Sequence, residues 1–213
     1  MENAHYFLHV TDTHLCFDAE APDICCTEQA LRSLYQTAFA WDHRPAFVLI
    51  TGDLVHEGTS ADYARAKTLL QELDEQYHTK TYPALGNHDN RENFNSAFRE
   101  QASDQPVDYC VQNEWLRWIV LDSSCGQVIG QLFGSQLAWL EQELCDPTDC
   151  PTILALHHPV YGTTTAETDA NNLATPDRLI RLLQDHPVDG ILCGHSHEAT
   201  LVTEQGLPPQ FVG

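Results

Sequence analysis

Basic side chains are scarce in this sequence. Its 213 residues include 10 Lys and Arg against 31 Asp and Glu, which gives a formal net charge of −21. A strongly negative protein is repelled by nucleic acid and by anionic membranes, because both are polyanions. The composition therefore predicts no nucleic-acid partner and no membrane partner. An anionic substrate would need bound cations to reverse the local field.

Long apolar runs and cysteine motifs are also missing. No stretch approaches the ~20 apolar residues of a membrane span, and the N-terminus lacks a basic region followed by an apolar one. The 8 cysteines contain no CxxC pair, since Cys25 and Cys26 are adjacent and Cys145 and Cys150 are five apart. We therefore expect reduced thiols, no thiolate metal site and a cytoplasmic location.

Short apolar runs alternate with helix-like stretches along the chain, without repeats or a low-complexity linker. This alternation predicts a layered α/β fold and a single domain over residues 1–213. Strands are expected at 7–10, 46–50, 81–85, 108–111, 115–121, 152–156, 188–192 and 200–203. Helices are expected at 30–41, 60–75 (with Ser60 as its cap), 135–144 and 176–184.

Polar residues follow the predicted strands directly at five places. In layered α/β folds, ligands bind at the carboxyl ends of strands. Carboxylates, an amide oxygen and imidazoles are ligands that suit Mn, Fe, Co or Zn, and a carboxylate can bridge two metals about 3.5–4 Å apart. One such cluster is commonly just a cap or turn, whereas five in this order are specific. The clusters are Asp12-Thr13-His14, Gly52-Asp53, Gly86-Asn87-His88-Asp89, His157-His158-Pro159 and Gly194-His195-Ser196-His197.

Together these clusters resemble the motifs of the calcineurin-like metallophosphoesterase superfamily, over nearly the whole chain. Within it, the sequence is most similar to the bacterial class III cyclic nucleotide phosphodiesterases. That resemblance implies a four-layer α/β/β/α sandwich of two β-sheets flanked by helices. Such relatives continue past the last cluster with further strands, so we expect a sandwich shortened at its C-terminus. The narrower similarity is carried by Val10 to Leu15, Thr51 to Leu54, Leu121 to Ser123, Gln136 to Leu140 and Leu192 to His197.

The resemblance also implies a role for each polar cluster. His88 would be the catalytic residue beside the leaving group, and Asn87 and His88 would contact the substrate. Asp89 is expected to support its loop, and His158 either to pack beside the site or to contact substrate. The implied metal ligands are Asp12, His14 and His197 for one ion, Asn87, His157 and His195 for the other, and Asp53 as the bridge.

The implied activity is hydrolysis of 3′,5′-cyclic nucleotides such as cyclic AMP to 5′-monophosphates, with a metal-bound hydroxide as nucleophile. Two divalent ions are required, with Fe and Mn expected first and Zn or Co also suited to the ligands. One alternative is another small phosphodiester or a phosphomonoester, for example a glycerophosphodiester. A second alternative, a non-enzymatic scaffold, has no need for a full ligand set.

The residue three positions after Asp53 distinguishes this sequence from one branch of the superfamily. In the purple acid phosphatase branch an iron-binding tyrosine stands three residues after the bridging aspartate, where this sequence has His56. His56 is therefore expected to be a surface or structural residue, as are His5, His9, His43, His78 and His186. Near the C-terminus, residues 200–203 and Phe211-Val212 are expected to form a hairpin with an exposed edge. That edge predicts either a homo-oligomer formed through the C-terminal region or a lower stability than that of a longer relative.

Overall fold

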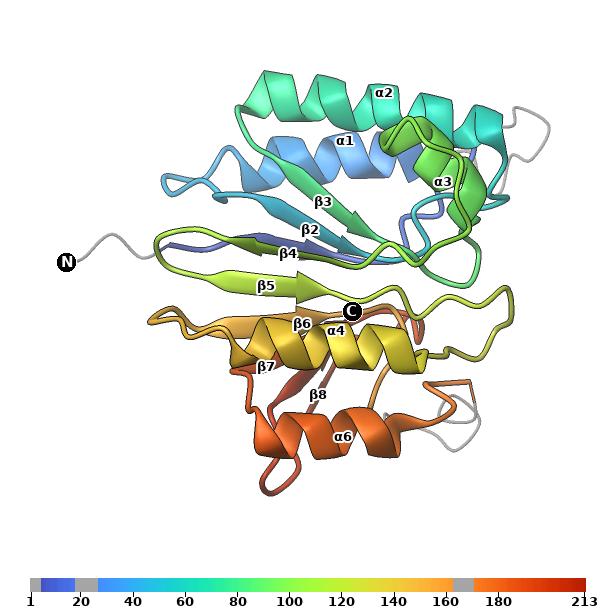
Figure 1. Ribbon diagram of the computed structural model, residues 1–213. Helices are drawn as coiled ribbons and strands as arrows, with labels where there is room; N and C mark the ends of the chain where they lie inside the picture. The colour runs from blue at the N-terminus through green and yellow to red at the C-terminus, as the bar shows by residue number, and fades with distance from the viewer. Residues whose placement is uncertain (1–4, 18–26, 163–170) are drawn as a thin grey trace.

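The computed structural model describes residues 5–17, 27–162 and 171–213, and within them two β-sheets pack between two layers of helices (Figure 1). This confirms the predicted α/β/β/α sandwich. The first sheet is parallel, in the order β1 (Leu8–Val10), β2 (Val48–Thr51), β3 (Thr81–Ala84). The second sheet has the order β4 (Tyr109–Gln112), β5 (Arg117–Val120), β6 (Thr152–Ala155), β7 (Gly190–Cys193), β9 (Gln210–Val212), β8 (Thr200–Val202).

Helices cover the outer face of each sheet. Among the described residues, the first sheet is covered by α1 (Thr27–Ala38), α2 (Ser60–Tyr77) and α3 (Arg91–Phe98). The second is covered by α4 (Gly134–Cys145) and α6 (Pro176–Asp185). None of these helices has the length and apolar character that a membrane crossing requires.

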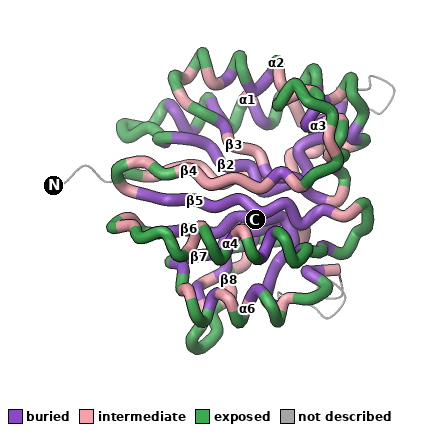
Figure 2. Tube along the Cα trace, in the orientation of Figure 1, coloured by how far each residue is buried: buried purple, intermediate pink, exposed green. Residues whose placement is uncertain are grey.

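Strand alternation divides the apolar side chains among three core layers. On β2, Val48 and Ile50 pack against the helices, whereas Leu49 faces the second sheet. On β5, Trp118 faces the first sheet and stacks on Phe47, with ring centroids 4.2 Å apart. Because successive strand residues point to opposite faces, strands covered on both sides are apolar throughout. Figure 2 shows β5 and β6 buried along their length, as expected of central strands in a sandwich.

Three helices differ from the predictions. α1 runs from Thr27 to Ala38, whereas residues 30–41 were expected. Ser60 is not the cap of α2, because Thr59 adopts the extended cap conformation and its hydroxyl accepts the Asp62 amide hydrogen at 3.2 Å. Ser60 is already the first helical residue. The helix α3 was not predicted, since its eight residues are mostly polar, although Asn90 caps it by accepting from the Asn93 amide.

The C-terminal hairpin is confirmed, with an added detail of strand order. β8 and β9 are antiparallel, and β9 lies between β7 and β8, pairing in parallel with β7. β8 is therefore the edge strand of the second sheet. Leu201 and Phe211 are direct partners in this hairpin and are 58% and 43% exposed, so the edge presents neighbouring apolar side chains to solvent.

Candidate metal centre

The five polar clusters follow β1, β2, β3, β6 and β7, and they meet at one end of the sandwich. In one group, His197 Nε2 lies 3.2 Å from Asp12 Oδ1 and 3.4 Å from His14 Nε2. These three residues come from opposite ends of the chain, since His14 and His197 are separated by 183 positions. Strands from both sheets therefore contribute to one cluster of donor atoms.

A second group of donors lies beside the first. Asn87 Oδ1 lies 3.1 Å from His157 Nε2 and 2.9 Å from His195 Nδ1, and the two imidazole nitrogens are 3.3 Å apart. Asp53 stands between the groups, with Oδ2 at 3.6 Å from His14 Nε2 and 3.5 Å from His157 Nε2. Among the described carboxylates, Asp53 is the one with an oxygen within 4 Å of an imidazole nitrogen of each group.

These spacings fit a pair of metal ions. A metal about 2.1 Å from each nitrogen or oxygen ligand places neighbouring ligands roughly 3.0–3.4 Å apart. Asp12 Oδ1 is buried and accepts no hydrogen bond, although it faces the imidazole of His197. A buried carboxylate oxygen without a donor is costly, and a cation at this position would satisfy it.

Burial favours the neutral form of two of the site imidazoles, which is the form that metal ligands require. Burial lowers the pKa of His14 and lowers that of His195 to about 4, although Asp53 acts in the opposite direction on both. His157 donates from Nδ1 to the Thr51 carbonyl at 2.9 Å, which leaves its Nε2 lone pair facing Asn87 and Asp53. Such a contact selects the tautomer and fixes the ring before a metal binds.

The backbone at the site is unusual. Five site residues have positive φ angles, between 39° and 75°, a region that few non-glycine residues adopt but that Asp and His tolerate better than most. Hydrogen bonds between clusters hold these turns, since Asp12 N donates to Gly52 O at 3.1 Å and His14 N to Asp53 O at 2.8 Å. Conformations of this kind persist only where the surrounding structure holds them. The five residues are Asp12, His14, Asp53, His195 and His197.

Close backbone approach at Gly194 keeps Asp12 in place. Asp12 Oδ2 accepts from Thr11 Oγ1 at 2.5 Å and from the His195 amide at 2.9 Å. A Cβ added to Gly194 would collide with Thr11 Oγ1 and lie 2.5 Å from Asp12 Oδ2. Only glycine therefore allows the end of β7 to lie against the end of β1.

We expect Gly194→Ala to weaken metal binding about 10- to 100-fold, the usual effect of disturbing the residues that orient a ligand. Titration calorimetry with Mn²⁺ measures the change. Gly190→Ala is the matched control. Gly190 begins β7, the strand that Gly194 follows, and a Cβ there meets its nearest neighbour, Pro209 O, at an ordinary 3.7 Å. Equal Mn²⁺ affinity in both variants would contradict the role given to Gly194.

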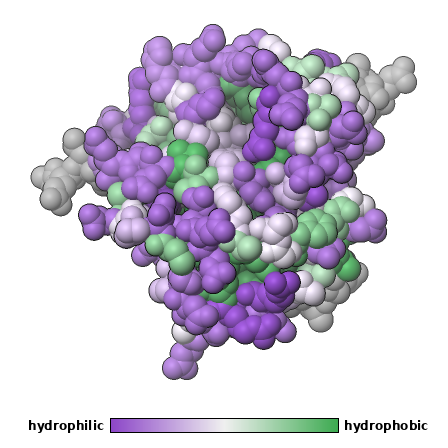
Figure 3. All heavy atoms as spheres, viewed as in Figure 1, coloured by the Kyte–Doolittle hydropathy of each residue, from purple (hydrophilic) through white to green (hydrophobic). Residues whose placement is uncertain are grey.

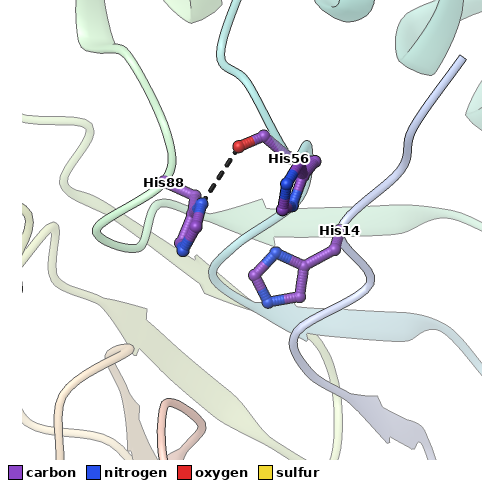
Figure 4. A group of neighbouring side chains, drawn as sticks. All are labelled: His14, His56 and His88. Carbon is purple, nitrogen blue, oxygen red and sulfur yellow. Dashed lines mark hydrogen bonds between the residues drawn. The ribbon is translucent and has the colours of Figure 1, made fainter. Parts of the chain in front are cut away.

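His88 and His56 lie at the rim of the site, and sequence reasoning identified only the first. We expected His56 to be a surface or structural residue, but its half-buried ring lies 5.3 Å from that of His88 and 5.6 Å from that of His14. Figure 4 shows the three rings gathered, with His88 Nδ1 donating to the His56 carbonyl at 3.0 Å. Its position three residues after Asp53 was the one signal in the sequence.

Two neighbouring residues have supporting positions. Asp89 is buried and accepts from Gly86 N at 2.9 Å, from Leu54 N at 3.0 Å and from the Tyr63 hydroxyl at 2.8 Å, so it supports the loop as predicted. His158 is buried, with Nε2 donating to the Val128 carbonyl at 3.1 Å and Nδ1 2.7 Å from a serine hydroxyl. His158 therefore packs beside the site, the first of the two alternatives.

A cavity of about 380 Å³ opens in front of the donor atoms. No lysine or arginine is among the described residues that line it. A phosphate-containing ligand would therefore meet Asp53 without any permanently cationic side chain to offset the repulsion. Its described lining is Asp53, Asn87, His88, Val128, Asn171, His195, Ser196 and His197.

His9 lies under the site and links stability to pH. Its Nε2 is 2.8 Å from Thr51 Oγ1, and burial lowers its pKa from 6.5 to about 4, with Asp12 acting in the opposite direction. Folding thus favours the neutral ring. Between pH 6.5 and pH 4 the unfolded chain binds a proton that the folded chain does not, so stability falls as the pH falls through this range.

We expect the metal-free protein to lose about 2 kcal/mol of unfolding free energy through His9 between pH 7 and pH 5. Urea denaturation at the two pH values measures the loss. His9→Gln keeps a hydrogen-bonding nitrogen but does not titrate, so its loss should be smaller by that amount. Parallel pH dependence in the two proteins would rule out this contribution.

Comparison with known proteins identifies the family. The calcineurin-like phosphoesterase family model matches residues 5–199. The chain therefore belongs to the calcineurin-like phosphoesterase family, as the five clusters predicted. A "Probable cyclic nucleotide phosphodiesterase" of Rhodococcus erythropolis is 35% identical over 96% of this chain and 68% of the relative.

Two further proteins are similar to the chain. The "Glycerophosphodiester phosphodiesterase GpdQ" of Enterobacter lignolyticus is 33% identical over 74% of this chain. The chain covers 58% of that relative's length. A solved dimetal phosphatase from Danio rerio has the same fold, with a TM-score of 0.76 and 15% identity over 99% of this chain and 87% of its own.

Proposed function

We propose that this protein is a binuclear metal-dependent phosphodiesterase that hydrolyses 3′,5′-cyclic nucleotides to 5′-monophosphates. The observation that carries the proposal is the pair of donor groups sharing Asp53, which stands 3.6 Å from His14 and 3.5 Å from His157. Asp12, His14 and His197 would hold one ion, and Asn87, His157 and His195 the other. Family membership and the similarity to a cyclic nucleotide phosphodiesterase support this choice.

Two divalent cations at this site would neutralise the phosphate charge and acidify a water molecule. The absence of Lys and Arg from the described cavity lining makes this neutralisation essential. Fe and Mn are proposed first, and Zn or Co also suit a set of carboxylate, amide and imidazole ligands. Asn87, which lines the cavity, would also contact the substrate.

His88 is proposed as the general acid. Its Nδ1 proton is held by the His56 carbonyl at 3.0 Å, so the ring keeps one orientation. The protonated ring carries a second proton at Nε2, which it can donate to the departing 3′ oxygen. General acid catalysis of this kind contributes about 10²–10⁴-fold. His88 is exposed and lines the cavity, so it can reach a bound substrate.

A second candidate is hydrolysis of glycerophosphodiesters, which the similarity to the Enterobacter protein favours. The metal ligands would be the same for both substrates, so the test must compare substrates directly. Metal-stripped protein should be assayed with Mn, Fe, Co or Zn added back, against cyclic AMP, cyclic GMP, glycerophosphocholine and a phosphomonoester. A higher kcat/KM for glycerophosphocholine than for either cyclic nucleotide would replace the first candidate with the second.

We also propose a cytoplasmic location. Among the described residues, six cysteines are free thiols, as expected in a reducing compartment. Cys25 and Cys26 lie outside the described residues. The six are Cys16, Cys110, Cys125, Cys145, Cys150 and Cys193.

Self-association through the C-terminal hairpin is expected from its exposed edge. Unpaired edge strands recruit other strands, and apolar side chains on Leu201 and Phe211 add contact area. Sedimentation velocity should show concentration-dependent dimers that Leu201→Lys shifts to monomer. Trp41→Lys, at a residue 56% exposed elsewhere, should leave the dimer unchanged. A monomer at every concentration would contradict this prediction.

A further inference from the structure

A second cavity lies at the side of the sandwich, where the edge strands β3 and β4 meet beneath α2 and α3. The Tyr109 hydroxyl on β4 donates to the Pro83 carbonyl on β3 at 2.9 Å, which joins the two sheets below the cavity. The cavity has a volume of about 290 Å³ and shares no residue with the metal centre. This volume is close to the roughly 300 Å³ at which small-molecule sites begin.

Positive charge is concentrated at this cavity. Lys67, Lys80 and Arg99 line it, three of the 10 basic residues in a chain of net charge −21. Within the described residues, Lys80 and Arg99 have no ion-pair partner. Lys67 donates to the Ala97 carbonyl at 2.7 Å, and its ammonium group has two further hydrogens to donate. An anion would therefore find several unused donors here.

The acidic residue in the lining offsets only part of this charge, because Asp74 is one carboxylate beside three basic side chains. Asp74 accepts from the Thr81 amide at 3.0 Å and from the Thr81 hydroxyl at 2.5 Å, so its two oxygens are already used in holding β3. Arg99 also acts electrostatically on Tyr109, another residue of the cavity lining. Burial raises the pKa of the Tyr109 hydroxyl, and Arg99 acts on it in the opposite direction.

Aromatic rings supply the rest of the lining. Tyr82, Phe94, Phe98 and Tyr109 face the cavity, and the rings of Phe94 and Phe98 are stacked 4.5 Å apart. Phe98 is half-buried, so part of its surface is open to a ligand. On the face drawn in Figure 3, hydrophilic residues surround a hollow with apolar surface inside it. A flat ring packs well against such walls, and its charged group can meet the cations at the rim.

We propose that this cavity is a binding site for a small aromatic anion, a planar ring carrying a phosphate or carboxylate group. The ring would lie against Phe98 and Tyr82, and the acidic group would bind Lys80 and Arg99. An uncharged ring would contact only the aromatic residues, and a free inorganic anion would contact only the basic residues. The proposal is independent of the reaction at the metal centre, because no residue is common to the two cavities.

Calorimetric titration of the metal-loaded full chain tests the proposal. The probes are adenosine 5′-monophosphate and indole-3-acetate, which distinguish a phosphate from a carboxylate ligand, with adenosine and inorganic phosphate as half-ligands. At least one aromatic anion should bind at this cavity at least tenfold more tightly than either half-ligand. Adenosine 5′-monophosphate can also bind at the metal centre. Variants of the cavity residues are therefore needed to show which binding event takes place in the cavity.

The double variant Lys80→Ala/Arg99→Ala should bind the aromatic anion in the cavity at least tenfold more weakly. Arg178→Ala/Arg181→Ala makes the same change in net charge on α6 and should leave binding in the cavity unchanged. Phe98→Leu keeps apolar volume but removes the ring, and should weaken binding by about threefold to tenfold. Retention of all binding by the Lys80/Arg99 variant, or absence of binding by both aromatic anions outside the metal centre, would overturn the proposal.

Discussion

Asp53→Ala should remove both metal ions and reduce metal-dependent phosphodiester hydrolysis to background. Its Oδ2 lies between the two donor groups, 3.6 Å from His14 and 3.5 Å from His157, so its loss affects both ions. The other oxygen accepts the His88 amide at 2.9 Å, so the loop carrying the proposed acid also loses an anchor. Two metals about 3.5–4 Å apart depend on such a bridge to offset their mutual repulsion.

Metal content after gel filtration measures this effect directly, because it does not depend on the substrate. Asn87→Ala is the informative comparison, since among the described donor atoms Asn87 contacts those of His157 and His195. We expect this variant to retain one ion and Asp53→Ala to retain none. Asp104→Ala, at an exposed acid elsewhere, should keep both ions. Two tightly bound ions in Asp53→Ala would contradict the bridging role.

His88→Ala should keep both metals but lower kcat by about 10²–10⁴-fold, the usual contribution of a general acid. The reason is positional: His88 lies at the exposed rim, its Nδ1 is engaged by the His56 carbonyl, and its Nε2 is left for the leaving oxygen. His43→Ala, at an exposed histidine outside the cavity, should have no effect on kcat.

The leaving group provides a sharper version of this test. A p-nitrophenolate departs without protonation, whereas a ribose oxygen needs a proton as the bond breaks. His88→Ala should therefore slow hydrolysis of an aryl phosphodiester much less than hydrolysis of a cyclic nucleotide. Equal losses for the two substrates would argue against an acid role, and loss of metal comparable to that in Asp53→Ala would make His88 a ligand.

Some of this molecule could be predicted from local sequence because the signals are local. The nearly continuous apolar runs of β2 and β5 reflect burial on both faces, so these strands were clear from the sequence. The polar clusters directly follow β1, β2, β3, β6 and β7, which placed the donors at one end of the sandwich. The helix α3 was missed because its polar sequence lacks an apolar pattern and its cap is a single asparagine.

The chemistry of the donors is a property of the sequence alone, whereas their arrangement into groups is tertiary. Carboxylate, amide and imidazole side chains are metal ligands wherever they occur, and strand ends bring them to one edge. Only the folded chain sets His14 beside His197 across 183 positions and holds Asp12 and Asp53 with positive φ angles. It also places His56 against His88 and gathers Lys80 and Arg99 around the side cavity. Sequence spacing specifies neighbours along one strand, but contacts between distant segments depend on how the two sheets pack.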